Sequence, residues 1–235
     1  MADWNQVERH FDQADAAMLR GENHLSADLR YAAYILQVCS PKSGAEILDV
    51  GCGDGVVCRA IKQLRPDLSI SGVDISSVLI EKAQAAGEGI AYQVANVVEQ
   101  EFFLSARFDL IFSFSFARYL DADELTKLNR TLLSKLHLGG KVCHLSIPDR
   151  RKWLLYCVCN QLNQGRSQAR AWAMGVAITL AKLRDPKMSD GISRWHRAAR
   201  LLAALPPDVR ARINRPSDSW YRFDLIAESS ESTHE

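Results

Sequence analysis

Across the middle of the chain, short apolar runs alternate with stretches whose apolar residues recur every three to four positions. The apolar runs predict strands at residues 47–50, 69–73, 90–94, 108–112 and 141–147. The periodic stretches between them predict helices at 55–64, 78–86 and 123–136. Strands and helices alternating in this way are typical of a Rossmann-like, doubly wound α/β fold, with a mostly parallel sheet and helices on both faces.

The pattern changes on both sides of this core. Residues 5–20 and 26–38 have helical periodicity, residues 151–204 look helical with breaks near Asp185 and Asp190, and the alternating WYRFDLIA at 220–227 predicts one more strand. A turn is expected at Gly139 and Gly140. The expected division is a helical N-terminal cap (1–40), a Rossmann-like core (41–150), a basic helical insertion or lid (151–218), a terminal strand of the core (219–228) and a disordered tail (229–235).

Charge is distributed unevenly along the chain. The net charge of +1 gives no reason at whole-chain level to expect a nucleic-acid partner, but residues 150–222 hold 15 Lys and Arg against 4 Asp and Glu, a net +11. Three explanations of this positive charge stay open. The basic residues could form solvated helix faces, bind an anionic substrate, or contact a membrane surface or an acidic partner protein. The spacing of Arg194, Arg197 and Arg200 is typical of a solvated helix face.

The cysteines and the apolar stretches bear on the compartment. The six cysteines lack the spacing of metal ligands, so no metal site is predicted, and several lie in apolar runs where a free thiol acts as a small hydrophobe. The N-terminal sequence does not read as a signal peptide, and the late apolar stretches 153–158 and 171–183 are too short to span a bilayer. We therefore expect a cytoplasmic protein, either a monomer or a homodimer.

A glycine-rich turn follows the first apolar run, in the sequence ILDVGCGDG at 47–55. At the carboxyl edge of a parallel sheet, such a turn lets the backbone approach a ligand closely. Its third glycine is Gly55, whereas a dinucleotide fingerprint would need glycine at Val56. Asp49 and Asp54 would repel a pyrophosphate but suit a ligand with a cationic amine.

Polar residues also follow the next two strands. Asp74 ends the second strand, 19 residues after Gly55, where an acid can accept hydrogen bonds from both hydroxyls of a ribose. Asn96 follows the third strand and could bond an adenine amino group. Together these positions favour an adenosine-containing ligand with a cationic group.

Five motifs make the chain resemble the class I S-adenosylmethionine-dependent methyltransferases of the small-molecule type. They are DVGCGDG (49–55), VDIS (73–76), ANV (95–97), FDLIFS (108–113) and LGGKV (138–142). They occur in the family's order over about residues 45–147. The resemblance implies S-adenosyl-L-methionine as cofactor, S-adenosyl-L-homocysteine as product, and a seven-stranded sheet whose last strand is antiparallel beside the fifth.

The resemblance also implies a set of cofactor-binding residues. Asp49 would orient the loop and the cofactor amine, Asp74 would take the ribose hydroxyls, and Asn96 stands by the adenine where the family often has Asp. The full set is Asp49, Gly51, Cys52, Gly53, Gly55, Asp74, Ile75, Asn96, Val97 and Ser113.

Candidates for the substrate side are less sharply defined. After the fourth strand, Arg118 could hold an anion, and Tyr119 could contact substrate or act in catalysis. His144 and His196 are candidate bases, although a histidine within a strand, as at His144, is more often a hydrogen-bonded core residue. Tyr31 and Phe11, in the N-terminal helices, are candidates to line the site.

The expected function is methyl transfer from S-adenosyl-L-methionine to a small or medium metabolite. An oxygen acceptor is favoured because no Asn/Asp-Pro-Pro-Tyr/Phe signature follows the fourth strand, and an anionic acceptor is one option. The alternatives are another transferase of the same fold, such as an aminopropyl transferase, or a non-catalytic cofactor-binding partner protein. Nucleic acid is not favoured as a partner, and peripheral membrane contact stays open without being favoured.

Overall fold

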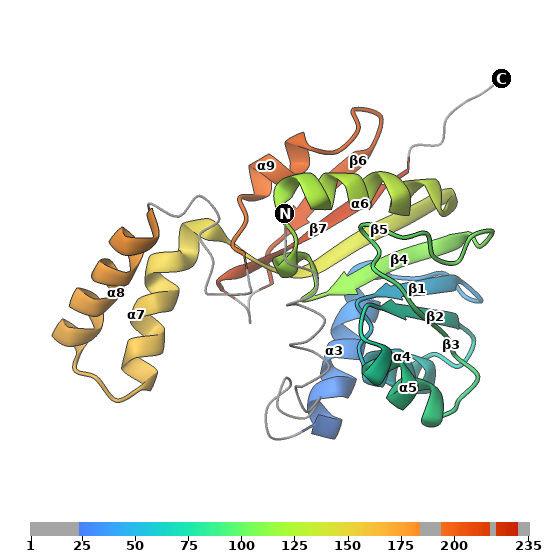
Figure 1. Cartoon of the computed structure of the whole chain (residues 1–235), viewed down its shortest axis with the longest axis horizontal. Helices are drawn as coiled ribbons and strands as arrows, with labels where there is room; N and C mark the ends of the chain where they lie inside the picture. Colours follow the sequence, from blue (N-terminus) through green and yellow to red (C-terminus); the bar gives the residue numbers. More distant parts are fainter. Residues whose placement is uncertain (1–23, 184–193, 217–219, 230–235) are drawn as a thin grey trace.

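The computed structural model describes residues 24–183, 194–216 and 220–229 of the chain (Figure 1). Its centre is a seven-stranded sheet in the order β3-β2-β1-β4-β5-β7-β6. The strands are β1 (Glu46–Val50), β2 (Ser69–Asp74), β3 (Ala91–Val94), β4 (Phe108–Phe114), β5 (Leu136–Pro148), β6 (Arg210–Asn214) and β7 (Arg222–Glu228). The first five pair in parallel, whereas β7 is antiparallel to both β5 and β6. The predicted fold class and the antiparallel last strand beside the fifth are confirmed.

Helices cover both faces of the sheet (Figure 1). One face carries α3 (His24–Cys39), α4 (Val56–Leu64) and α5 (Ser77–Ala85), and the other carries α6 (Ala122–Ser134) and α9 (Ala198–Ala203). Successive strand residues point to opposite faces, so Ile47 packs on the side of α3 and Leu48 on the side of α6. Burial on both sides explains why the central strands read as continuous apolar runs.

The start of α6 is fixed by charged groups. The Asp121 carboxylate accepts from the N–H groups of Asp123 and Glu124, while the Glu124 carboxylate accepts from the N–H of Asp121. The buried guanidinium of Arg194 lies 3.0 Å from the carboxylate of Asp121 and 3.5 Å from that of Glu124. The spacing of Arg194 had suggested a solvated face, and that expectation is wrong, because these two carboxylates draw the side chain into the fold.

Some local expectations differ from the structure. Gly139 and Gly140 lie inside β5 instead of forming a turn, at a point where its pairing with β4 shifts register. The sixth strand, β6, lies in the stretch that was assigned to the helical insertion. It was not predicted because its largely polar sequence, RARIN, lacks a strong strand pattern. The helix expected at 5–20, the breaks near Asp185 and Asp190, and residues 230–235 lie outside the described residues.

Two helices, α7 (Trp153–Asn163) and α8 (Gln168–Leu183), form a hairpin that extends away from the sheet (Figure 1). They approach closely, since a Cβ added to Gly175 of α8 would lie 2.6 Å from Val158 Cγ2 of α7. We call this hairpin, residues 153–183, the arm. A short 3-10 turn, η2 (Arg150–Lys152), joins it to β5.

Candidate active site

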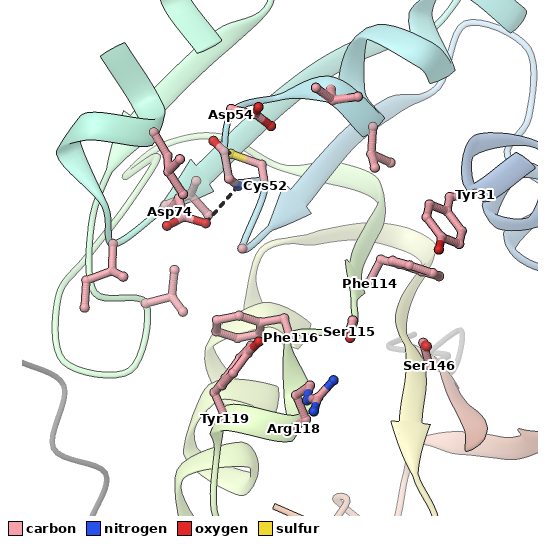
Figure 2. Close-up of a pocket in the computed structure, with 18 of the residues that line it drawn as sticks. Tyr31, Cys52, Asp54, Asp74, Phe114, Ser115, Phe116, Arg118, Tyr119 and Ser146 are labelled. Atoms are coloured by element: carbon pink, nitrogen blue, oxygen red, sulfur yellow. Dashed lines mark hydrogen bonds between the residues drawn. The ribbon is translucent and has the colours of Figure 1, made fainter. Parts of the chain in front are cut away.

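A cavity of about 650 Å³ opens at the carboxyl edge of the sheet (Figure 2). Its walls come from the glycine loop after β1, the ends of β2, β4 and β5, the segment after β3, helix α3, and the start of β7. In open α/β sheets ligands bind at this edge, where the strand order reverses, and here β1 separates β2 from β4. The cavity therefore lies where the fold class places a ligand.

The glycine loop forms one wall and is fastened to β2. Gly51 and Gly53 line the cavity with φ angles of 78° and 56°, and a Cβ on Gly51 would lie 2.5 Å from Cδ2 of Phe116. The N–H of Gly53 donates to Asp74 Oδ2 at 2.8 Å (Figure 2), and the N–H of Ser76 donates to Oδ1 at 3.0 Å. These two bonds fix the Asp74 carboxylate at the cavity wall, where each oxygen can accept further hydrogen bonds.

Two predicted cofactor residues, Gly55 and Asp49, lie behind this wall. Gly55 precedes α4 with φ 73°, and a Cβ there would collide with the hydroxyl of Tyr92. Asp49 is buried, and its Oδ2 accepts from the Cys58 thiol at 3.3 Å. Burial raises the pKa of Asp49 to about 7; the Cys58 hydrogen bond opposes the rise and the charge of Asp74 adds to it. Both residues shape the loop from outside the cavity.

Apolar side chains and one amide form the next part of the wall. Ile75, Asn96 and Val97 all line the cavity, so three predicted cofactor residues lie together. Asn96 Oδ1 accepts from the N–H of Val98 at 3.1 Å, and Nδ2 donates to Glu99 Oε2 at 3.1 Å. These bonds orient the amide beside a slot whose sides, Ile75 and Val97, suit a flat aromatic ring.

The opposite side of the cavity holds a guanidinium that the sequence pattern did not single out. Arg222 begins β7, and its Nη1 donates to Ser115 Oγ at 3.3 Å and to the carbonyl and hydroxyl oxygens of Ser146. Both serines have left-handed φ angles, 58° and 65°, which non-glycine residues rarely adopt. Arg222 Nε is buried and has no hydrogen-bond partner among the described residues. A cation thus lies at the cavity wall with a donor that a ligand oxygen could satisfy.

A buried carboxylate ties this side to α3. Asp224 Oδ1 accepts from the N–H of Ser146 at 2.9 Å, and Oδ2 accepts from Asn214 Nδ2 at 2.8 Å and from the hydroxyl of Tyr34. Tyr31, one turn earlier on α3, packs against Phe114 with ring centroids 4.9 Å apart. The expectation that Tyr31 lines the site is confirmed, whereas Phe11 lies outside the described residues.

Residues 47–140 match a family model described as a methyltransferase domain. The chain also shares its fold with the magnesium protoporphyrin IX methyltransferase of Synechocystis PCC 6803 with bound SAH. The TM-score is 0.60 and the sequence identity 14%, over 97% of this chain and 100% of that one. Residues 47–140 therefore carry a methyltransferase domain.

Two curated relatives match part of the chain. The carboxy-S-adenosyl-L-methionine synthase of Campylobacter curvus is 29% identical over 100 residues, covering 41% of this chain and 42% of the relative. The ribosomal RNA small subunit methyltransferase C of Serratia proteamaculans is 30% identical over 118 residues, covering 47% of this chain and 33% of the relative. The chain thus spans less than half the length of either relative, and the arm lies outside the residues that match the family model.

One predicted base, His144, lies in the core of the methyltransferase domain instead of its cavity. The ring is buried in β5, with Nδ1 2.8 Å from Ser113 Oγ and Nε2 2.8 Å from Asn129 Oδ1. Because an amide oxygen only accepts, Nε2 donates to Asn129 and Nδ1 accepts from the serine hydroxyl. Burial lowers the pKa of His144 to about 4, so the ring is neutral. Ser113, predicted beside the cofactor, bonds this histidine and does not line the cavity.

The second predicted base, His196, also lies outside this cavity. Its Nε2 donates to the carbonyl of Ala117 at 3.1 Å, and its backbone N–H donates to that of Pro148 at 2.9 Å. Burial lowers its pKa to about 4. These bonds hold the short 3-10 turn η1 (Ala117–Tyr119) against the end of β5. Of the three predicted catalytic residues, Tyr119 alone lines the cavity, beside the predicted substrate residue Arg118.

Sequence reasoning missed most of the side of the cavity opposite the glycine loop. The missed residues are Tyr34, Ser146, Arg222 and Asp224. The alternation in WYRFDLIA contained one signal, since Arg222 and Asp224 are two positions apart and must share a face of the strand. No local sequence pattern predicts the positive φ of Ser146. This residue lies where the pairing of β5 with β7 is irregular.

Proposed function

We propose that this chain transfers a methyl group from S-adenosyl-L-methionine to an ionised oxygen of a small or medium-sized acceptor, and that the acceptor carries a carboxylate. The observation that carries the proposal is one continuous cavity. It has the glycine loop and Asp74 on one side, and Arg118, Tyr119 and Arg222 on the other. A cofactor and an acceptor held in it would lie next to each other, as group transfer requires.

The described residues fit the cofactor. Asp74 would accept the ribose hydroxyls, Ile75 and Val97 would pack on the adenine, and Asn96 would meet its edge. Asp54, which lines the cavity at the loop, provides a carboxylate for the cationic amine. Asp49, Gly55 and Ser113, which lie behind the wall, would act indirectly by holding the loop and the strand in place.

The chemistry of the walls favours an acceptor that needs no base. The described lining residues include no histidine, and the one carboxylate on the acceptor side, Asp224, already accepts three hydrogen bonds. When bound, the cofactor supplies an electrophilic methyl group whose C–S electron pair stays on sulfur as the acceptor oxygen forms the new C–O bond. A carboxylate oxygen is ionised at neutral pH, so no proton has to leave.

The arginines of the cavity support an anionic acceptor. A guanidinium binds a carboxylate with two parallel hydrogen bonds, and the hydroxyls of Ser115 and Ser146 hold the Arg222 guanidinium at the wall. Arg118 lies beside Tyr119, its Cζ 5.8 Å from the centre of the ring. We assign Arg222 to the acceptor anion, with Arg118 and Tyr119 as further contacts.

A methyl-transfer assay on a mixture of candidate acceptors tests the proposal. The protein is incubated with a metabolite extract and cofactor labelled in its methyl group. Carboxyl methyl esters release their label as volatile methanol in mild alkali, so we expect a base-labile, volatile product. A base-stable labelled product would refute the carboxylate acceptor, and no labelled product from extracts of several organisms would count against the enzyme.

Variants of Arg222 test the binding mode with the purified acceptor. Arg222→Gln should lower kcat/KM by roughly a hundredfold, since a charged, paired hydrogen bond contributes about 3 kcal/mol, while cofactor affinity stays constant. The matched control is Arg210→Gln, which removes an exposed charge on β6. Equal kcat/KM for Arg222→Gln and the control would show that the anion is held elsewhere.

A further inference from the structure

The arm exposes apolar side chains that the rest of the described chain does not cover. On α8, Trp172, Val176 and Leu180 recur every four residues and so share one face, and Trp172 and Leu180 are 48% and 59% exposed. The buried side of α8 is narrow and made largely of small residues such as Ala171 and Gly175. A helix that is apolar almost all round is normally covered on all sides, so another surface is needed to cover this one.

Helix α7 adds a second exposed stripe. Leu155, Cys159 and Leu162 are spaced by four and three residues, which places them on one face, and all three are exposed. The opposite face of α7 carries Trp153 and Cys157, which are buried. Each helix of the arm therefore packs against the protein with one face and leaves another apolar face uncovered by the described residues.

The charge of the arm selects what covers it. The arm contains three basic residues, Arg166, Arg170 and Lys182, and no Asp or Glu. At its root η2 adds Arg150, Arg151 and Lys152, of which Arg151 pairs with Asp149. Two arms packed together would bring like charges into contact, which is unfavourable. A surface of anionic lipid offers both an apolar layer and the opposite charge.

The root of the arm is an aromatic cluster that joins the arm to the rest of the fold. Trp153 packs edge-on against Trp195 with centroids 4.9 Å apart, and Tyr156 packs against Tyr221 at 5.1 Å. Trp153 and Trp195 are only 3% and 5% exposed, so this cluster fixes the position of the arm and leaves contact with a partner to the stripes on α7 and α8. Tyr221 also lines the cavity, so the root of the arm adjoins the candidate active site.

We infer that the arm docks the protein on an anionic lipid surface. The apolar stripes of α7 and α8 enter the boundary between headgroups and acyl chains, and the basic residues meet the headgroups. Within the described residues, no helix has the length and apolar character to cross a bilayer, so the arm lies along the surface. This inference stands independently of the methyl acceptor, because it rests on residues outside the cavity.

Co-sedimentation of the full chain with vesicles tests the inference. We expect binding to phosphatidylcholine vesicles that contain phosphatidylglycerol, weaker binding at high salt, and little binding to phosphatidylcholine alone. Leu180→Gln should weaken binding roughly tenfold, since it removes a leucine that becomes buried at the surface. Leu138→Gln, on a leucine of β5 that is even more exposed (76%), should leave binding unchanged. Arg170→Gln should weaken binding roughly fivefold, and Arg210→Gln should not.

Three results would overturn the inference. They are no binding to the anionic vesicles, equal binding by the Leu180→Gln and Leu138→Gln variants, and a dimer in light scattering that Leu180→Gln converts to a monomer. The last would show that a second copy of the chain covers the arm. Because no cofactor or acceptor is present in these measurements, their outcome does not depend on methyl transfer.

Discussion

Replacing Asp49 by asparagine tests the electrostatics beneath the glycine loop. The folded protein buries this carboxylate, which raises its pKa from 3.8 to about 7. Between these two values the folded state holds the proton more tightly than the unfolded chain does. The contribution of Asp49 to the free energy of unfolding therefore falls as pH rises through this window, and it is constant above it. Asparagine does not titrate, so the free energy of unfolding of the variant does not fall with pH for this reason.

The size of the effect follows from the shift. About three pKa units, at about 1.4 kcal/mol each, correspond to about 4 kcal/mol. The difference in free energy of unfolding, Asp49→Asn minus wild type, should rise by about this amount from pH ~4 to pH ~7. His144 and His196, whose pKa values are lowered to about 4, act in the opposite direction, because they stabilise the fold less as pH falls below ~6.5. Both proteins contain them, so they cancel in the difference.

The assay is urea unfolding, followed by circular dichroism, of both proteins at several pH values. The control is Asp123→Asn, which changes an exposed carboxylate in the first turn of α6; the rise with pH should be larger for Asp49→Asn than for this control. A flat difference for Asp49→Asn would show that Asp49 is not a desolvated carboxylate, and would refute its placement beneath the loop.

Two further substitutions test the packing around the site. Gly55→Ala combines a φ of +73° with a collision against the Tyr92 hydroxyl, so it should lower the free energy of unfolding by about 2–3 kcal/mol. Gly87→Ala, which has a similar φ and open space, should cost only about 1 kcal/mol; equal losses in chemical denaturation would contradict the collision. His144→Leu strands two buried polar partners and should cost about 2–4 kcal/mol. The affinity of the folded His144→Leu variant for the cofactor should equal that of the wild type. A large loss of affinity in calorimetric titration would show that this histidine contributes to cofactor binding.

The strands and the cofactor side of the site could be predicted because their signals are local. The run Ile47–Val50 followed by glycines marks a buried strand and its carboxyl end. Asp74 could be predicted because it ends the next strand at the spacing that the motif VDIS gives. The roles of the loop glycines could not be separated. Gly51 faces the cavity, while Gly55 makes room for Tyr92, which lies 37 residues away in the sequence.

The side of the cavity opposite the glycine loop depends on contacts between distant segments. Arg222 meets Ser146 across 76 residues of sequence, through a strand pairing with a local irregularity. His144 was a candidate base because a strand residue can face either side of a sheet. Its hydrogen-bond partner, Asn129 on α6, lies in no sequence motif that would link it to His144. Long-range pairing, which short motifs do not encode, decided both cases.

The most direct test of the central claim is a calorimetric titration of the wild-type protein with S-adenosyl-L-homocysteine. We predict saturable binding of one molecule per chain. Binding should be about a hundredfold weaker in Asp74→Ala, which loses two hydrogen bonds to a charged group at about 1.5 kcal/mol each, and unchanged in Asp123→Ala. The absence of binding to the wild type, or equal affinity in Asp74→Ala with the fold intact, would contradict the account.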